Sequence, residues 1–165
     1  MSLRQLFIAS LLEPKKMAAF RIISIGKVIQ YVFIFIILIT IFSFFQFAFG
    51  IQNQSSSYAG LIEYIDGMEW ILYPFAFIIQ SVMSTLFVFS RISIMAIVGF
   101  YLLKLMKRRG DYRHVWRTTA FAYSLPTVIS FIMLLIGVGE TLIFVVTHSL
   151  SFIYLYVALN YYPSK

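Results

Sequence analysis

The hydrophobic positions of the chain gather into four long stretches separated by polar segments. The first, residues 28–49, carries no charged side chain. As an α-helix it would rise roughly 33 Å, enough to cross a hydrocarbon core of about 30 Å. Residues 74–104, 118–136 and 141–160 form the other three stretches. We therefore predict an all-α fold, a polytopic membrane helix bundle with four transmembrane helices in a single membrane domain.

Residues 2–26 precede the first span and are predicted to form a cytoplasmic interfacial segment. Ser2 and Gln5 have the spacing of a capping box, and Pro14 is suited to the first turn of a second short helix. Beyond Pro14, cations alternate with apolar residues. This pattern is typical of an interfacial amphipathic helix, which needs apolar residues for the acyl boundary and cations for anionic headgroups.

The outer end of the second stretch leaves two readings open. Residues 71–106 are too many for one straight span, and they lack the turn that two spans would need. We predict a surface or re-entrant entry near Pro74, followed by one tilted helix that ends near Lys104. In one reading residues 70–81 are transmembrane, and in the other they lie in the membrane interface. Residues 50–69 are predicted to form a polar extracytoplasmic loop.

The last two stretches carry a predicted kink and a predicted turn. Pro126 should kink the third span because its missing amide removes one helical hydrogen bond. Residues 137–140 should form a tight turn into the fourth span. Small residues share one face of each helix and favour close packing, with contact between two copies as the alternative. They are Ala120, Ser124 and Thr127 in the third span and Thr147 and Ser151 in the fourth.

Cations and acids fall on opposite sides of the predicted bundle. Twelve of the 13 Lys and Arg residues lie on the side of the termini and of the basic loop, residues 105–117. The outer loops contain four acids and neither Lys nor Arg. Because loops rich in Lys and Arg stay in the cytoplasm, we expect a multi-pass protein of the cell membrane with cytoplasmic N- and C-termini. The arrangement also accounts for the net charge of +7 without nucleic acid as a partner.

The thirteenth cation, Arg91, lies inside the second stretch, and His148 lies inside the fourth. At about 1.5 Å of rise per residue, they lie roughly 20 Å and 18 Å from the cytoplasmic boundary. Ionisable groups at such depth often serve function, so we predict a mid-membrane polar layer. Its candidate members are Arg91, His148, Ser130, Thr40, Gln80 and Ser84.

This layer has a functional and a structural reading. It contains no carboxylate, so as a binding site it would suit an anion or a polar headgroup. In the structural reading, Arg91 bonds backbone carbonyls or extends toward Glu140, and His148 bonds a neighbouring helix.

The cytoplasmic cations are candidate contacts for anionic lipid headgroups, each worth about 1 kcal/mol near a membrane surface. In the alternative reading they only set the topology. The candidates are Lys15, Lys16, Arg21, Lys27, Lys104, Lys107, Arg108, Arg109, Arg113 and Arg117.

The residues predict no enzyme, no cofactor and no metal site. The chain has no cysteine, which excludes disulfides and thiolate ligands. It has no His-Glu-x-x-His run, and its two Asp residues fall in predicted loops. A pair of Ser130 and His148 would lack an accompanying oxyanion motif. With 61% hydrophobic and 12% charged residues, the chain also departs from soluble domains, which have roughly 45–50% and about 25%.

Two sequence motifs resemble a bacterial membrane-protein family of unknown function. One is Glu13-Pro-Lys-Lys-Met-Ala-Ala-Phe-Arg21 with Ile25-Gly-Lys27, and the other is His114-Val-Trp-Arg117 with the residues up to Thr127. Some members of that family carry the label maltodextrin utilization protein, and the family is distantly similar to the Yip group of trafficking proteins. The resemblance implies a membrane location and a helical bundle. It implies no catalytic residues.

These features favour a non-enzymatic accessory, scaffold or lipid-organising subunit of a larger membrane complex. Its expected partners are anionic membrane lipids and either another membrane protein or a second copy. The alternative is a small transporter or channel subunit for an anionic or polar solute that uses the mid-membrane layer.

Overall fold

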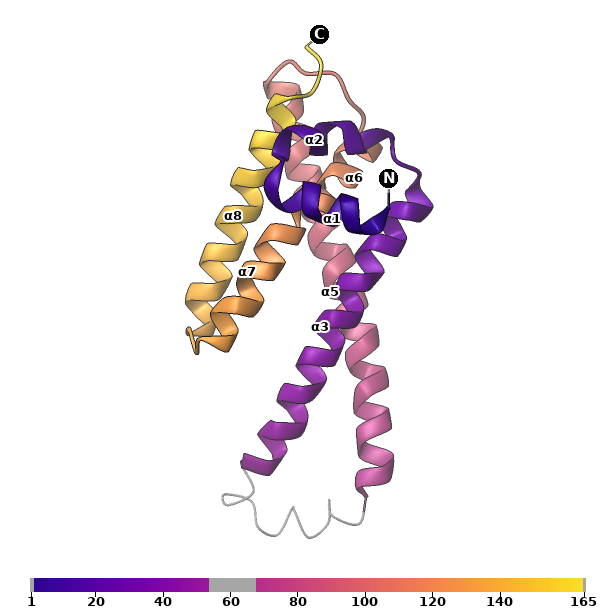
Figure 1. Cartoon of the computed structure of the whole chain (residues 1–165), viewed down its shortest axis with the longest axis vertical. Coiled ribbons are helices and arrows are strands. Elements are labelled where there is room, and N and C mark those ends of the chain that lie inside the picture. The colour runs from indigo at the N-terminus through magenta and orange to yellow at the C-terminus, as the bar shows by residue number, and fades with distance from the viewer. Residues whose placement is uncertain (1, 54–67, 165) are drawn as a thin grey trace. The chain divides into compact units, whose positions relative to one another are not determined.

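The computed structural model describes residues 2–53 and 68–164, and in this part of the chain the regular elements are all helices (Figure 1). The elements are α1 (Leu3–Leu12), α2 (Pro14–Ala19), the short 3-10 helix η1 (Phe20–Ile22), α3 (Ile25–Asn53), α5 (Glu69–Leu105), α6 (Tyr112–Ala122), α7 (Ser124–Leu135) and α8 (Glu140–Asn160). The predicted all-α fold is confirmed.

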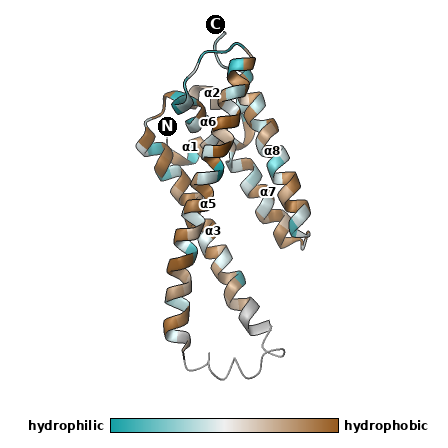
Figure 2. Cartoon of the chain, turned by 180° about the vertical axis from the view of Figure 1, so that it is seen from behind, coloured by the Kyte–Doolittle hydropathy of each residue, from teal (hydrophilic) through white to brown (hydrophobic). Residues whose placement is uncertain are grey.

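Four helical segments are long and apolar enough to cross a membrane: Ile25–Phe49, Trp70–Leu105, Tyr112–Leu135 and Glu140–Asn160. Hydrophobic residues cover much of their length (Figure 2). The longest helix, α5, has 37 residues and therefore rises roughly 55 Å. This length exceeds the thickness of a bilayer core, which is about 30 Å.

The chain forms two compact units, which are described separately. Unit 1 comprises residues 1–32 and 90–165, and unit 2 comprises residues 33–89. Both boundaries fall inside the long helices α3 and α5.

The N-terminal helices of unit 1 begin as the sequence predicts. Ser2 and Gln5 form a reciprocal capping box at the start of α1, and Pro14 occupies the first turn of α2. Both helices pack on the remainder of unit 1, α1 on α6 and α7 and α2 on α6 and α8. Leu6 and Met17 are fully buried there. The N-terminal segment is therefore part of the core of unit 1, and its position at a membrane interface stays a prediction.

A chain of three hydroxyl groups joins α1, α3 and α7 inside unit 1. Tyr31 Oη lies 2.9 Å from Ser10 Oγ and 2.6 Å from Ser124 Oγ. Ser10 also donates to the Phe7 carbonyl at 2.7 Å. All three hydroxyl-bearing residues are buried, so each hydroxyl depends on the others for hydrogen bonds that water does not supply. A further bond, from Tyr154 Oη to the Leu11 carbonyl at 2.7 Å, ties α1 to α8.

Two prolines have different effects on their helices. Pro74 lies within the uninterrupted helix α5, so the helix already begins before Pro74. Its missing amide leaves the Trp70 carbonyl without a helical donor, yet the helix continues, as is tolerated in membrane helices. Whether residues 70–81 are transmembrane or lie in the membrane interface stays a prediction. The break between α6 and α7 falls at Tyr123. Pro126 explains that break because its missing amide leaves the Ala122 carbonyl without a helical donor.

Local caps set where α6 begins and where α7 ends. Asp111 caps α6 in a box with His114, so the helix starts earlier than the predicted third span and includes part of the predicted basic loop. Gly137 has φ +80°, a conformation that favours glycine. The Val138 amide donates to the Met133 carbonyl across this turn, as in a Schellman motif. The tight turn predicted at residues 137–140 is confirmed.

We expect Tyr31→Phe to destabilise unit 1 by about 1–3 kcal/mol, because it removes one hydroxyl that serves two buried partners. The measurement is the thermal unfolding midpoint of the purified protein in mild detergent. Tyr101→Phe is the matched control, since Tyr101 is 62% exposed. Equal midpoints for the two variants would contradict a stabilising role of the hydroxyl chain.

Candidate functional site

The guanidinium of Arg91 on α5 meets side chains from two other parts of unit 1. Its Nη1 donates to the Tyr123 hydroxyl at 3.1 Å, and its central carbon lies 4.8 Å from the centre of the Tyr123 ring. Its Nη2 lies 3.5 Å from Thr147 Oγ1 and 3.4 Å from His148 Nδ1. Tyr123 and Thr147 are buried, whereas Arg91 and His148 are half-buried. We call these four residues the Arg91 cluster.

The neighbours of His148 identify which ring nitrogen carries its proton. Nδ1 lies 2.8 Å from the Phe144 carbonyl, one turn earlier in α8. Because a carbonyl only accepts, we assign the proton to Nδ1. Nδ1 and Arg91 Nη2 are then both donors, so their 3.4 Å approach is a contact and not a hydrogen bond. The structural reading of the sequence places the His148 bond on a neighbouring helix, but here it stays within α8.

Arg91 has no counter-ion among the described residues. Among the described residues, the ion pair of a Lys or Arg side chain with an acid joins Lys16 to Glu13. The bonding partners of Arg91 are uncharged hydroxyls, and its buried Nε has no hydrogen-bond partner in the described part of the chain. A charge removed from water without a counter-ion is costly. The Arg91 cluster is therefore electrostatically incomplete.

The cavity that lies beside the Arg91 cluster in the described residues is small. A cavity of about 10 Å³ adjoins Tyr123, which is space for roughly one water molecule. Its other lining residues are Ile92, Met95, Thr119, Ala122 and Ser151. A ligand larger than water has no room in this cavity.

The other predicted members of the polar layer lie elsewhere. The Ser130 hydroxyl donates to the Thr127 carbonyl of its own helix at 2.7 Å. Thr40, Gln80 and Ser84 belong to unit 2. Thr40 and Ser84 are buried, and the Thr40 hydroxyl has no hydrogen-bond partner among the described residues. Of the six predicted residues, the structure brings Arg91 and His148 into contact.

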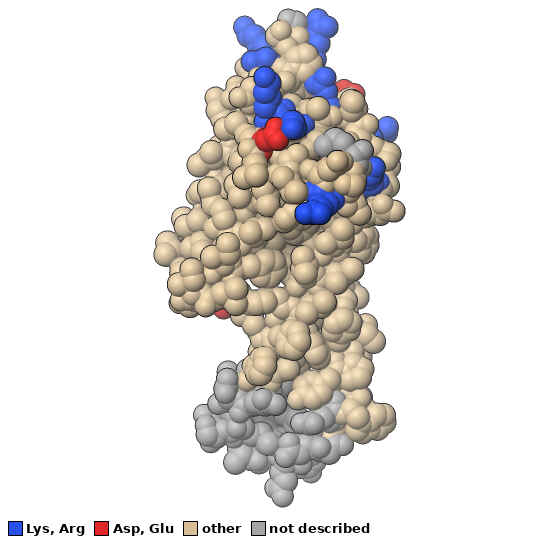
Figure 3. Space-filling view, viewed as in Figure 1, with Lys and Arg blue, Asp and Glu red and all other residues tan. Residues whose placement is uncertain are grey.

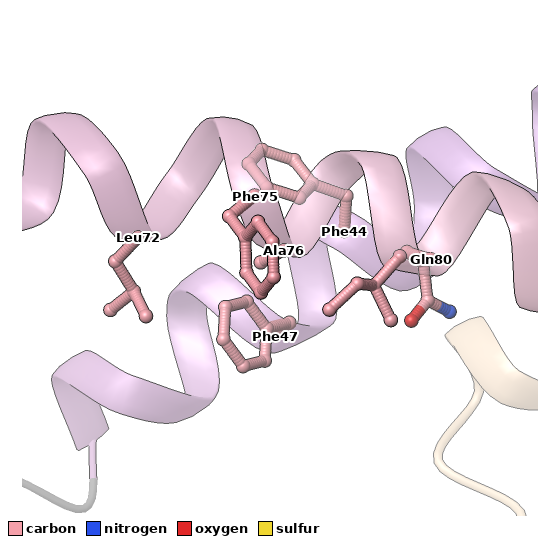
Figure 4. A pocket seen from close by; sticks show the side chains of 7 residues that line it. Phe44, Phe47, Leu72, Phe75, Ala76 and Gln80 are labelled. Atoms are coloured by element: carbon pink, nitrogen blue, oxygen red, sulfur yellow. The ribbon is translucent and has the colours of Figure 1, made fainter.

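Unit 2 contains a groove of about 280 Å³ between α3 and α5 (Figure 4). Its apolar lining is formed by Phe44, Phe47, Leu72, Phe75, Ala76 and Ile79. Gln80 contributes the one polar side chain of this lining. The groove therefore suits an apolar ligand and not an anion.

The candidate lipid-contact residues all belong to unit 1, and Lys and Arg gather toward one end of it (Figure 3). Three arginines have internal partners. Arg108 Nη1 donates to the Tyr162 carbonyl at 2.8 Å, and Arg117 Nη1 donates to the Arg21 carbonyl at 2.9 Å. The Arg21 guanidinium lies 5.1 Å from the centre of the Tyr162 ring. Lys27 is half-buried, and the remaining candidates are exposed: Lys15, Lys16, Lys104, Lys107, Arg109 and Arg113.

Tyr162, which follows α8, contacts both α6 and the segment after α5. Its hydroxyl lies 2.7 Å from Thr118 Oγ1, and its ring packs on Gly110, where an added Cβ would come within 3.0 Å. The Arg109 amide also donates to the Pro163 carbonyl at 2.8 Å. We call this set of contacts the C-terminal latch.

Burial raises the pKa of Tyr162 to about 12, although the Thr118 hydrogen bond and the charge of Arg21 act in the opposite direction. A neutral, buried phenol at this place is therefore part of the folded state.

Comparison with protein families identifies the chain. The model of the family described as "Protein of unknown function (DUF1189)" matches residues 54–159. The chain belongs to this family. No curated protein and no solved structure matches it. The uncharacterised family expected from the sequence motifs is therefore shown, and the matched range includes the whole Arg91 cluster.

Sequence reasoning missed two tyrosines of this DUF1189 chain. Tyr123 lies within the predicted third span and Tyr162 follows the predicted fourth, and the hydropathy pattern gives neither a role, yet the hydroxyl of each makes a contact at least partly buried. For Tyr123 the available signal was its place three residues before Pro126, where the helix has to break. For Tyr162 no signal in the pattern pointed to Thr118.

We expect Arg91→Leu to leave the thermal unfolding midpoint in detergent unchanged or to raise it, because the substitution removes a half-buried charge that has no counter-ion among the described residues and is therefore costly to hold. Arg117→Leu is the comparison. The buried Nε of Arg117 likewise has no hydrogen-bond partner among the described residues, but its Nη1 donates to the Arg21 carbonyl of η1, and loss of that bond should lower the midpoint. A strongly lowered midpoint for Arg91→Leu would show that Arg91 serves stability.

We expect Tyr162 to ionise near pH 12. The measurement is a pH titration of tyrosinate absorbance, in which the Tyr162→Phe variant should lack the transition near pH 12. Because the folded pKa of Tyr162 lies above the ordinary value of about 10, its contribution to stability is full below pH 10 and is lost as the pH rises through 12. Tyr161→Phe is the control and should retain the transition near pH 12. A Tyr162 transition near pH 10 would contradict the buried latch.

Proposed function

We propose that this DUF1189 chain is a multi-pass protein of the cell membrane that acts as a non-enzymatic accessory, scaffold or lipid-organising subunit of a larger complex. Both termini would lie in the cytoplasm. The observation that carries the proposal is the incomplete Arg91 cluster. Its charge lacks a counter-ion in the described residues, and its inner side adjoins a cavity of about 10 Å³. The group that neutralises the charge of Arg91 is therefore expected to belong to another molecule.

The distribution of cations supports the proposed orientation. The six exposed candidate residues lie in α2, in the last turn of α5, in the loop after α5 and at the start of α6, and Lys and Arg gather toward one end of unit 1 (Figure 3). Loops with many Lys and Arg residues are retained in the cytoplasm, and each such cation attracts anionic lipid by about 1 kcal/mol. Arg21, Arg108 and Arg117 are better explained as structural, since their internal contacts hold the C-terminal latch and η1 together.

The apolar groove of unit 2 supports a lipid-organising role. Its volume of about 280 Å³ lies close to the lower end of small-molecule sites, about 300–1,000 Å³. Its apolar lining suits an acyl chain. The expected likeness to the Yip trafficking group would agree with such a role, whereas the maltodextrin label has no counterpart in the site.

Purification of the full chain from its native membrane in mild detergent tests the proposal. We expect other membrane proteins to co-purify reproducibly, and the Arg91→Leu variant to lose them while keeping its unfolding midpoint. Arg113→Leu is the control, because Arg113 is exposed and has no contact with the Arg91 cluster. A lone chain that catalyses anion flux in liposomes, with flux dependent on Arg91 or His148, would refute the proposal and establish a transporter.

A further inference from the structure

We propose that the Arg91 cluster binds a carboxylate supplied by a membrane-spanning helix of a different protein. This inference rests on the proposed accessory function and specifies the chemistry of its partner. The ligand is the side chain of an Asp or Glu located at the depth of Arg91 in the partner helix.

The hydrogen-bonding groups of the cluster favour an anion. Arg91 donates to Tyr123, so the hydroxyl proton of Tyr123 is available to a further acceptor. Thr147 donates its own proton to the Ile143 carbonyl at 2.8 Å, and His148 Nδ1 is occupied by Phe144. Arg91 and Tyr123 therefore remain as two adjacent donors, one of them charged, and such a pair matches the two oxygens of a carboxylate.

The depth of Arg91 favours a helix-borne carboxylate over a lipid phosphate. Arg91 precedes Lys104 by 13 residues in the continuous helix α5, which corresponds to roughly 20 Å. In a hydrocarbon core of about 30 Å, Arg91 would lie some 10 Å or more from either boundary, whereas lipid phosphates lie outside the core. Contacts with Tyr123 and Thr147 also hold the guanidinium within unit 1, so it is not free to extend toward a surface.

A second copy of this chain does not have the required acid. Four of its six acidic residues lie between helices or at helix ends, and none of these four is near the depth of Arg91: Glu13, Glu69, Asp111 and Glu140. The other two, Glu63 and Asp66, lie outside the described residues, in the segment 50–69 that the sequence predicts to be a polar loop. The partner is consequently a different chain, and the charge on Arg91 selects it by the presence of one intramembrane acid.

The direct test uses synthetic membrane-spanning helices of Leu and Ala as probes. One carries a single Asp at its centre, and its twin carries Asn at the same place. Each is mixed with the full chain in phosphatidylcholine vesicles, and association is measured by fluorescence energy transfer. We expect the Asp helix to bind about tenfold more tightly or better than the Asn helix, as close charge pairs do. Equal binding of the two helices would overturn the inference.

Two further measurements link any preference to Arg91. In Arg91→Leu the preference for Asp should disappear, whereas the control Arg113→Leu should keep it. If Arg91→Leu does not fold, the wild-type chain is tested with Asp moved along the helix in steps of one turn. Affinity should peak where Asp matches the depth of Arg91, and a series without a peak would overturn the inference.

A lipid arm distinguishes the carboxylate from a headgroup phosphate. Replacing part of the phosphatidylcholine by phosphatidylglycerol should leave the preference for the Asp helix unchanged. Loss of that preference in phosphatidylglycerol vesicles would assign the cluster to lipid phosphate and overturn the inference. If the Asp and Asn helices bind equally while native membrane proteins still co-purify, the accessory function stands and the carboxylate assignment alone fails.

Discussion

Polar groups inside these apolar helices have to find their partners within protein, because an apolar surrounding offers none. Unit 1 is organised around this constraint. The Tyr31 hydroxyl joins Ser10 to Ser124 and so fixes α1 against α3 and α7. Tyr162 meets the constraint at the C-terminal latch through Thr118. Each of these bonds joins segments that are distant in the sequence, so satisfying a few hydroxyls also determines how the helices pack.

Arg91 is where the constraint is only partly met. Its hydroxyl partners supply dipoles, but none of its contacts in the described residues supplies a negative charge, and its Nε has no hydrogen-bond partner there. The same residue that disturbs the electrostatics of unit 1 is thus the one most suited to recognition. A protein that completes the site gains both hydrogen bonds and charge neutralisation in one contact, whereas a neutral helix gains neither.

The sequence predicts those features of the fold that depend on local patterns. Hydropathy identifies four long apolar helices, and spacing identifies the capping box at Ser2 and the helix start at Pro14. Simple depth arithmetic places Arg91 and His148 at similar heights, and they are in contact. The continuity of α5 across Pro74 does not follow from the pattern, because a proline can either end a membrane helix or be tolerated inside it.

The remaining site residues depend on how each helix is rotated about its axis, which neither hydropathy nor depth reveals. Thr147 was predicted as a small packing residue, yet its hydroxyl faces Arg91. Arg21, Arg108 and Arg117 could not be told from exposed cations, because their partners are backbone carbonyls or a ring in distant segments.

The hydroxyl chain also has a consequence for the order of events during synthesis. Ser124 belongs to the same set of three bonded hydroxyls as Ser10, but it is translated 114 residues later. Tyr154, whose hydroxyl donates to the Leu11 carbonyl, is translated later still. Because α1 and α2 pack on α6, α7 and α8, which are translated after them, these two helices can complete their contacts only after that later part of the chain has been made.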